Sequence, residues 1–428
     1  MFFSYSILHQ MKQFLLLFAL FVFSFQAAQA CTTAVISGKF TKDGRPLLWK
    51  HRDTWAVNNH IKVFDDGKYR CIGLVNSKDK KNKSIWIGYN EKGFAIMNSA
   101  SYNLNNDTIR QTGYEGRIMK EALQTCANLA DFEALLNRMD LPRRLEANFG
   151  VIDASGGAAY YEVGNFKFTK FDVNDPTVAP YGYIIRTNHS LTGKLGEGGG
   201  YIRYKTADDD FQMAIREGRL SPKSIVQGCS RNMNNSLTHV NLAETYGNIK
   251  ENTPTYASFT DYIPRRGTSS SVIIEGVKSG EDASFSTMWA VLGWPLSSVC
   301  MPLWLDKEVE LPNIVKMDDN LKDSPLCNMA LQAKEAAYSY QWGYSYKYYI
   351  NVNALVNADH TGLIQLFTPL ENDIFAKADK MIDGWRKNGK KDYGQMRQFY
   401  QWIDQEIPTF YNDKLNIKPL APAKVNKK

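Results

Sequence analysis

Cys31 stands directly after Ala28-Gln29-Ala30, and small residues at the first and third of these positions are what signal peptidase requires. Lys12 and an apolar run over residues 14–25 precede them, so the chain has the three parts of a secretory leader over residues 1–30. Cutting after Ala30 would leave Cys31 with both its thiol and a free α-amine. Such an amine has an unperturbed pKa of about 7.7 to 8.0 and can accept the thiol proton near neutral pH. The spacing therefore predicts a nucleophile that carries its own base.

The chemistry expected of such a residue is amide cleavage through an acyl-enzyme. The α-amine takes the thiol proton, the thiolate attacks a carbonyl, and the resulting ammonium protonates the leaving amine. While the leader is attached, the Cys31 nitrogen is an amide and cannot act as a base, so leader removal would also be activation. The reaction further needs a carboxylate to orient the amine, donors for the oxyanion, and a cation.

Two other roles for Cys31 are open. A lipoprotein cysteine would make this a lipid-anchored, non-enzymatic surface binding protein, but that signal usually has a larger aliphatic residue where Ala28 stands and a small one where Gln29 stands. An ordinary structural cysteine could also lie at the cut. We expect an exported protein, periplasmic or secreted. We expect no integral membrane span after leader removal, because the apolar run is short and close to the cut.

Composition excludes several other classes. The 428 residues are 44% hydrophobic and 13% aromatic, enough for one large or two ordinary domains. The six cysteines have no C-x-x-C spacing and the histidines have no metal-binding spacing, which argues against a metal site and a disulfide-stapled scaffold. The net charge is +7, but no Arg-rich run is interleaved with aromatic residues, so no nucleic-acid partner is expected. The oligomeric state, a homo-oligomer included, is left open.

Three hairpins are predicted around the candidate nucleophile. β-formers pair residues 32–36 with 47–50 across Asp43-Gly44, and the same pattern pairs 85–89 with 94–98 and 148–153 with 158–162. The ends of the first hairpin must converge, which brings Lys50-His51-Arg52-Asp53 back towards Cys31. Strand alternation puts Lys50 and Arg52 on one face and Asp53 on the other.

Helical spacing of apolar residues predicts helices within 116–138 and 206–217, followed by short strands at 268–275 and 287–292. Beyond about residue 325, amphipathic helices are predicted over 329–344, 371–387 and 393–407, with Gly and Pro mainly at the gaps. We therefore divide the chain into a leader, residues 1–30, a catalytic domain, residues 31–320, and a helical extension with a basic tail, residues 321–428.

The opening segment Cys31-Thr32-Thr33, Asp43-Gly44 and residues 47–53 resembles the cysteine amino-terminal-nucleophile hydrolases. These include choloylglycine hydrolases, penicillin V acylases, the acyl-coenzyme A:6-aminopenicillanic acid acyltransferase group and secreted dipeptidases. Further along, residues 90–95 resemble their hairpin tip, 184–189 and 201–204 resemble two later active-site segments, and 268–272 with 289–302 resemble the closing strands.

The resemblance implies an α+β fold, a four-layer αββα sandwich of two stacked sheets between helices, with the C-terminal helices as an extension. It implies no cofactor and no metal, and a small-molecule amide or short peptide as substrate. It gives Asp53 the role of orienting the amine, Asn98 and Asn188 that of binding the oxyanion, and Arg203 that of the active-site arginine. The family usually has an arginine three residues before the aspartate, where this chain has Lys50. Either Lys50 or Arg52 fills that role, and we favour Lys50.

The candidate site residues are Cys31, Lys50, Asp53, Asn98, Asn188 and Arg203. Each has a structural alternative. Asp53 could be an exposed strand-end carboxylate, and Asn98 could act through its backbone N–H. Asn188-His189-Ser190 is also a glycosylation acceptor, which would exclude an oxyanion role. Arg203 could form a surface ion pair with the acidic residues at 208 and 209.

The substrate stays open at this level. The aromatic side chains Trp49, Trp55 and Trp294 would suit an apolar acyl group near the site, and they would equally suit an ordinary core. A dipeptidase and an acyltransferase are alternatives within the same enzyme class.

Overall fold

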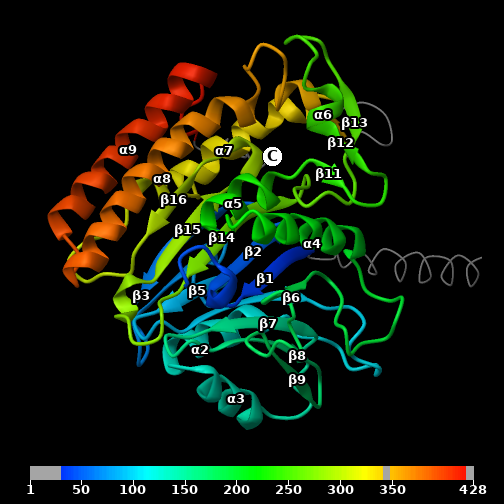
Figure 1. Ribbon diagram of the computed structural model, residues 1–428, viewed down its shortest axis with the longest axis vertical. Coiled ribbons are helices and arrows are strands. Elements are labelled where there is room, and N and C mark those ends of the chain that lie inside the picture. Colours follow the sequence, from blue (N-terminus) through cyan, green and yellow to red (C-terminus); the bar gives the residue numbers. More distant parts are fainter. Residues whose placement is uncertain (1–29, 341–347, 421–428) are drawn as a thin grey trace, which may run out of the picture.

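Cys31 is the first residue of the strand next to one edge of a six-stranded antiparallel sheet (Figure 1). The computed structural model describes residues 30–340 and 348–420. The strand order is β10-β1-β2-β14-β15-β16. These strands are β1 (Cys31–Ile36), β2 (Leu47–Asp53), β10 (Tyr183–Arg186), β14 (Thr268–Glu275), β15 (Thr287–Leu292) and β16 (Cys300–Leu303).

The second sheet has seven antiparallel strands that follow one another in chain order, from β3 to β9. These are β3 (Asn59–Phe64), β4 (Cys71–Asn76), β5 (Ile87–Asn90), β6 (Ala95–Ala100), β7 (Ala147–Ile152), β8 (Ala158–Val163) and β9 (Phe168–Asp172). Two smaller pairs lie apart from it, β11 (Asn234–Asn235) with β12 (Val240–Asn241) and β13 (Tyr256–Ser258) with β17 (Tyr349–Asn351).

The two sheets stack face to face, and helices cover both outer faces (Figure 1). Apolar side chains of β1, β2 and β6 such as Val35, Leu48 and Met97 fill the space between the sheets. Helices α2 (Glu115–Thr125) and α3 (Leu129–Arg138) pack on the outer face of the seven-stranded sheet around Phe132 and Phe149. The expected four-layer α+β sandwich is thereby confirmed.

The other helices lie on the side of the six-stranded sheet that faces away from α2 and α3 (Figure 1). They are α4 (Tyr201–Arg216), α5 (Pro222–Gln227), α6 (Leu242–Tyr246), α7 (Pro325–Ala337), α8 (Leu363–Asn388) and α9 (Tyr393–Leu415). Side chains of the C-terminal helices, including Leu326, Ile374 and Ile403, belong to the same apolar cluster as Val272 and Trp289 of the sheet. The helices after residue 325 thus share one core with the strands that carry the site.

All three predicted hairpins are present. β1 pairs with β2, β5 with β6, and β7 with β8, each antiparallel. Gly44, with φ +80°, provides the left-handed conformation in the first turn that other residues adopt at a cost. β1, β2 and β14 are buried along their whole length, as expected for strands covered on both faces.

The helical material expected within 116–138 is present as two helices, α2 and α3, and Asn128 caps α3 by accepting a hydrogen bond from the Asp131 amide. Two other helix predictions need correction. Residues 338–340 are not helical, and residues 341–347 lie outside the described range. Helices α8 and α9 run through Pro369 and Pro408, which were expected near gaps. Burial of their apolar faces outweighs the roughly 3 kcal/mol that an interior proline costs.

All six cysteines are unpaired thiols in the structure. The leader predicted over residues 1–30 lies outside the described residues except for Ala30, which is buried. Within residues 30–340 and 348–420, none of the helices is both long and apolar enough to cross a membrane.

Candidate active site

The pairing of β1 with β2 sets the surroundings of Cys31. Cys31 lies opposite Arg52, and Thr33 lies opposite Lys50. Because directly opposite residues in an antiparallel pair point to the same face, Cys31, Lys50 and Arg52 share one face. Lys50 contacts Asn98 of β6, so this face is the one turned towards the seven-stranded sheet. Asp53 lies on the other face of β2, as strand alternation predicted.

Asn188 and Arg203 hold the backbone of Cys31. Thr33 lies opposite Arg186 in the β1 and β10 pair, so the residue two positions beyond β10 returns to the level of Cys31. The Cys31 N–H donates to Asn188 Oδ1 at 3.1 Å. Arg203, near the start of α4, donates to the Cys31 carbonyl oxygen at 2.7 Å and to Asn188 Oδ1 at 2.8 Å. Three of the six candidate residues are therefore in direct contact.

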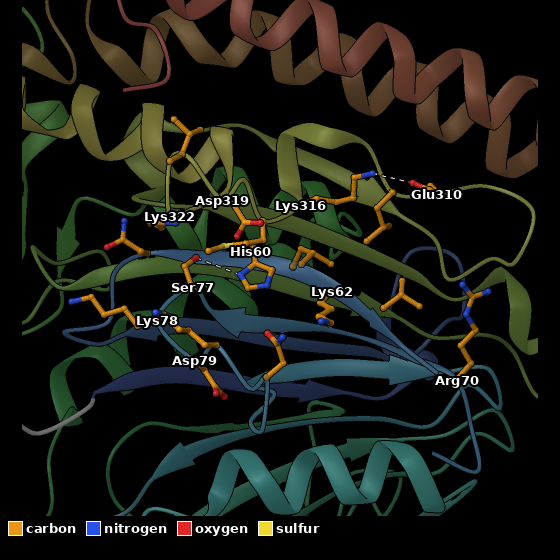
Figure 2. Close-up of a pocket in the computed structure, with 18 of the residues that line it drawn as sticks. His60, Lys62, Arg70, Ser77, Lys78, Asp79, Glu310, Lys316, Asp319 and Lys322 are labelled. Carbon is orange, nitrogen blue, oxygen red and sulfur yellow. Dashed lines mark hydrogen bonds and ion pairs between the residues drawn. The ribbon is translucent and has the colours of Figure 1, made fainter. Parts of the chain in front are cut away.

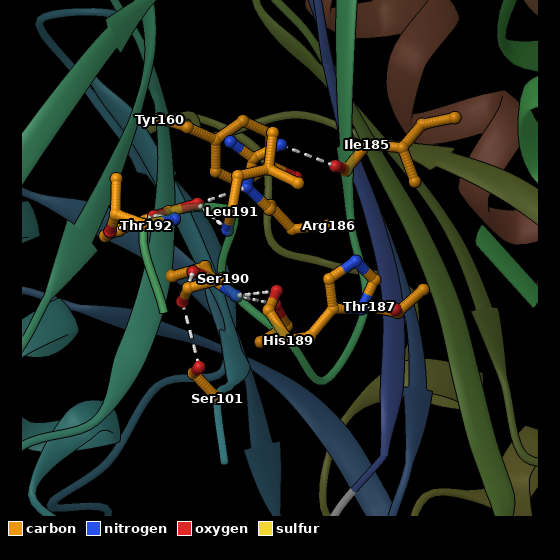
Figure 3. A network of polar contacts seen from close by, with 12 residues as sticks. Ser101, Tyr160, Ile185, Arg186, Thr187, His189, Ser190, Leu191 and Thr192 are labelled. Atoms are coloured by element: carbon orange, nitrogen blue, oxygen red, sulfur yellow. Dashed lines mark hydrogen bonds and ion pairs between the residues drawn. The ribbon is translucent and has the colours of Figure 1, made fainter. Parts of the chain in front are cut away.

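The segment that carries Asn188 is fixed by a buried polar network (Figure 3). Arg186 pairs with Glu162 at 2.8 Å, and both side chains are almost fully buried. The same carboxylate accepts hydrogen bonds from the backbone amides of Leu191 and Thr192. Ser190 donates to Asn148 Oδ1 at 2.6 Å. These contacts hold residues 186–192 in place and so determine the position of Asn188 relative to Cys31.

Two structural alternatives for these residues are excluded. Asn188 is only 1% exposed, so a glycan on it could not be accommodated. Arg203 is also 1% exposed, and Lys205 is the residue that pairs with Asp208 and Asp209. Burial lowers the pKa of Arg203 to about 10, with the positive charge of Arg265 acting in the same direction. The guanidinium therefore stays charged at neutral pH.

Lys50 contacts Asn98 rather than Asp53. Its ammonium donates to Asn98 Oδ1 at 2.7 Å and also to the Asn98 carbonyl oxygen. Lysine has only donors, so the amide oxygen of Asn98 must face Lys50 and the Nδ2 donor must point away from it. Lys50 therefore sets the orientation of the amide that the resemblance assigns to the oxyanion.

The charge of Lys50 is sensitive to pH. Burial lowers the pKa of Lys50 from 10.5 to about 8, although the Cys31 thiolate acts in the opposite direction. We expect kcat/KM to decline above about pH 8, because the ammonium that orients Asn98 is lost. Lys50→Arg should move this decline to higher pH, since a guanidinium keeps its proton. Profiles of kcat/KM against pH for the two proteins would measure the shift.

Unfolding would not explain that decline. The folded-state pKa of Lys50 is the lower one, so between about pH 8 and 10.5 the unfolded chain binds more protons. The contribution of Lys50 to the free energy of unfolding therefore rises with pH in this window. An unchanged decline in Lys50→Arg would contradict the role given to Lys50.

Asp53 has partners that the sequence did not predict. Arg265 donates to its Oδ2 from Nε at 3.0 Å and from Nη2 at 2.5 Å, and the Thr268 hydroxyl donates to its Oδ1 at 2.5 Å. Burial opposes the charge of Arg265, but the Asp53 carboxylate outweighs it and raises the pKa of the guanidinium. The Cys31 nitrogen is not among the donors to Asp53 in the described part of the chain, where it is still an amide bonded to Ala30.

Of the three tryptophans considered from the sequence, one lies near the site and two do not. Trp55 is 77% exposed, and Trp49 packs on Phe211 beneath α4. Trp294 lies near the site, because its indole N–H donates to the Arg265 carbonyl oxygen at 2.9 Å. Trp86, which the sequence did not single out, lies against Arg52 with 4.6 Å between the guanidinium carbon and the ring centre.

A large groove lies elsewhere in the described part of the chain (Figure 2). Its volume is about 1130 Å³, it lies along β3, and none of the six candidate residues lines it. His60 and Ser77 meet there at 3.4 Å, and Ser77 donates to Asp323 at 2.9 Å. The serine stands between the imidazole and the carboxylate, so this is not the order of a catalytic triad, in which the imidazole stands between them. The groove offers no alternative nucleophile of that kind.

Solved structures similar to this chain include three amide hydrolases. A variant of conjugated bile acid hydrolase from Clostridium perfringens is 13% identical with a TM-score of 0.38, over 64% of this chain and 92% of that chain. Penicillin V acylase from Agrobacterium tumefaciens is 12% identical with a TM-score of 0.38, over 66% and 89%. A Caenorhabditis elegans orthologue of N-acylethanolamine-hydrolyzing acid amidase is 16% identical with a TM-score of 0.35, over 46% and 84%.

The sequence comparisons are more restricted. No curated protein sequence matches this chain. One family model matches, over a segment that contains Asn98, Asn188 and Arg203 and that begins after Cys31 and Asp53. The resemblance to the cysteine amino-terminal-nucleophile hydrolases is confirmed there: residues 85–214 match the acyl-coenzyme A:6-aminopenicillanic acid acyl-transferase family.

Proposed function

We propose that this protein is an exported cysteine hydrolase that cleaves a linear amide bond through an acyl-enzyme on Cys31. Residues 1–30 are the leader in this proposal, residues 31–320 the catalytic domain and residues 321–428 a helical extension. The substrate joins an acyl group or short peptide to an amine. Acyl transfer to an acceptor other than water is the alternative within the same chemistry, and the matched family is named for such a transfer.

The observation that carries the proposal is that buried side chains hydrogen-bond to the backbone of Cys31. Its nitrogen and its carbonyl oxygen are each bonded to a buried side chain, Asn188 and Arg203 respectively. A structural cysteine needs no such fixation, whereas a nucleophile that attacks with its own amine as base must hold both groups still. The position is also 4% exposed, which disfavours a lipid-bearing cysteine, because a lipid must leave the protein to reach a membrane.

The surroundings support the α-amine as base. His51 is the nearest imidazole along the strand pair, but it lies on the face of β2 opposite to Cys31. Burial lowers the pKa of His51 to about 4, so it is neutral, and neither ring nitrogen has a hydrogen-bond partner in the described chain. A thiol and imidazole pair is therefore not available there, and the amine released after Ala30 is the base that remains close to the thiol.

Four cations lie around the reacting position. The charges of Lys50, Arg52, Arg203 and Arg265 all interact with that of Cys31. Of these four, Arg265 alone forms an ion pair with a carboxylate among the described residues, and that carboxylate is Asp53. Preorganised positive charge of this kind stabilises a tetrahedral oxyanion. After the cut, Asp53 is the carboxylate that we assign to orienting the new amine, with Arg265 holding it in place.

A panel of amides tests the proposal. Protein that begins at Cys31 would be incubated with bile-salt conjugates, N-acyl amino acids, penicillin-like amides and short peptides. We expect release of the amine from at least one class, and an acyl mass added to the peptide that begins with Cys31 when the reaction is quenched early. Absence of turnover with every class, or an acyl group mapped to another residue, would refute the proposal.

A further inference from the structure

Arg52 is a buried cation whose end groups are unsatisfied. The residue is 1% exposed, and its two terminal guanidinium nitrogens have no hydrogen-bond partner among the described residues. Leaving charged donors buried and unpaired is costly, so a protein retains such a group mainly where a partner binds. Burial lowers the pKa of Arg52 to about 10, with Cys31 and Asp53 acting in the opposite direction, and the group is therefore charged at neutral pH.

The position of Arg52 relates it to the reacting bond. Arg52 lies directly opposite Cys31 in the strand pair and on the same face. Its guanidinium lies over the Trp86 ring at 4.6 Å. A cation stacked on an aromatic ring keeps its plane fixed while its N–H edge stays open to a partner in that plane. The two unpaired terminal nitrogens of Arg52 therefore belong to the same face of the strand pair as the thiol.

Asp53, the carboxylate nearest to Arg52 in the sequence, forms no hydrogen bond with the Arg52 side chain in the described chain. Asp53 lies on the other face of β2 and accepts its hydrogen bonds from Arg265 and Thr268. Lys50, the other cation on the Arg52 face, is already bonded to both oxygens of Asn98. Lys50 therefore orients Asn98, while the two terminal nitrogens of Arg52 remain available to a ligand.

We propose that Arg52 binds a carboxylate of the substrate, close to the amide bond that Cys31 attacks. This rests on the proposed function. The substrate class is then an anionic amide, such as an N-acyl amino acid or a peptide with a free carboxylate beside the scissile bond. A guanidinium and a carboxylate form two parallel hydrogen bonds, which fixes the orientation of the amide as well as its affinity. Loss of the residues before Cys31 also removes Ala30, the buried residue that precedes it in the chain.

The rival role for Arg52 is to support the charge of the Cys31 thiolate. Kinetics on paired substrates separates the two, because thiolate support acts on every substrate and carboxylate binding acts only on acids. Each pair consists of an N-acyl amino acid and its carboxamide, which differ only in the carboxylate.

The experiment compares the mature protein with Arg52→Lys and Arg52→Gln on such pairs. We expect the unsubstituted protein to prefer the acid, and Arg52→Gln to reduce that preference about 10- to 100-fold, mainly through KM. Arg52→Lys should retain part of the preference, because it keeps the charge but loses the planar fork. Arg143→Gln is the matched control: Arg143 is also a buried arginine with an unpaired terminal nitrogen, lies over Phe168, and should leave the preference intact.

Two results would overturn the inference. One is equal kcat/KM of the unsubstituted protein for acid and carboxamide, and the other is a fall in kcat in Arg52→Gln that is the same for both. If no amide is turned over, that result counts against the proposed function and not against the role of Arg52. The role of Arg52 is then tested by direct binding. In that case an N-acyl amino acid is titrated calorimetrically into Cys31→Ala and into Cys31→Ala/Arg52→Gln, and equal affinities would refute the role of Arg52.

Discussion

Cys31→Ser is expected to lower kcat/KM at least about 10³-fold, which is the scale on which removing a nucleophile acts. The hydroxyl keeps the position, the size and the adjoining amine, but an alcohol is far harder to deprotonate than a thiol. The backbone contacts of the residue to Asn188 and Arg203 do not involve the side chain, so the fold should be unchanged. The measurement is turnover of the best substrate of the panel by protein that begins at residue 31.

The matched control is Cys126→Ser, which removes another buried thiol, at the turn between α2 and α3. It should leave kcat/KM within about twofold, because a core substitution far from the active site changes the stability of the fold rather than the reaction. Similar losses in both variants would mean that the effect of Cys31→Ser is structural.

A second arm of this prediction concerns the amine. One extra residue before Cys31 keeps the thiol but turns its nitrogen back into an amide, and should lower kcat about 10²- to 10⁴-fold, the range expected for loss of a general base. In the described chain, that amide donates to Asn188 at 3.1 Å, so the extended form has a contact ready for its N–H and should fold normally. Equal rates for the extended and the mature protein would show that another group takes the thiol proton.

Sequence reasoning succeeded where contacts follow from strand pairing. The Asp-Gly turn fixed the first hairpin, and the hairpin fixed which residues of β2 return to Cys31. The resemblance of residues 184–189 and 201–204 identified Asn188 and Arg203, and in the structure Asn188 follows a strand that pairs with β1 while Arg203 lies in the first turn of α4. Hairpin geometry was sufficient for the residues of β2, whereas Asn188 and Arg203 were identified only through the family resemblance.

It failed where a contact depends on which strands become neighbours. Arg265 lies 212 residues from Asp53 in the chain, and only the pairing of β14 with β2 brings them together. The strand at 268–275 was predicted, but its neighbour was not. The register shift between Thr268 and Ser270 is equally invisible in the sequence, and such bulges commonly redirect side chains at active sites. Trp86 was missed because its contact with Arg52 crosses between the two sheets.

The pairing of Asp53 with Arg265 leads to the largest stability effect that we expect. Asp53→Asn should lower the free energy of unfolding by about 3 to 5 kcal/mol, because removing one partner of a buried pair leaves the other charge uncompensated. The side chain of Asp53 is 4% exposed and that of Arg265 is 27% exposed, so water reaches only part of the pair. An asparagine has one acceptor oxygen where the carboxylate has two, so its Oδ1 can face Thr268 or Arg265 but not both.

The double variant Asp53→Asn/Arg265→Gln should recover part of this loss, since it removes the charge that Asp53→Asn leaves unpaired. Asp66→Asn provides the matched control: Asp66 pairs with Lys120 at 2.8 Å, but it is 61% exposed, and the same substitution there should cost less than about 1 kcal/mol. Denaturant unfolding of five proteins, the unsubstituted chain, the two single variants Asp53→Asn and Arg265→Gln, the double variant and Asp66→Asn, measures all the differences under one set of conditions. If the double variant were as unstable as the sum of its two single variants, the ion pair would contribute nothing, and Arg265 would have to be assigned a role independent of Asp53.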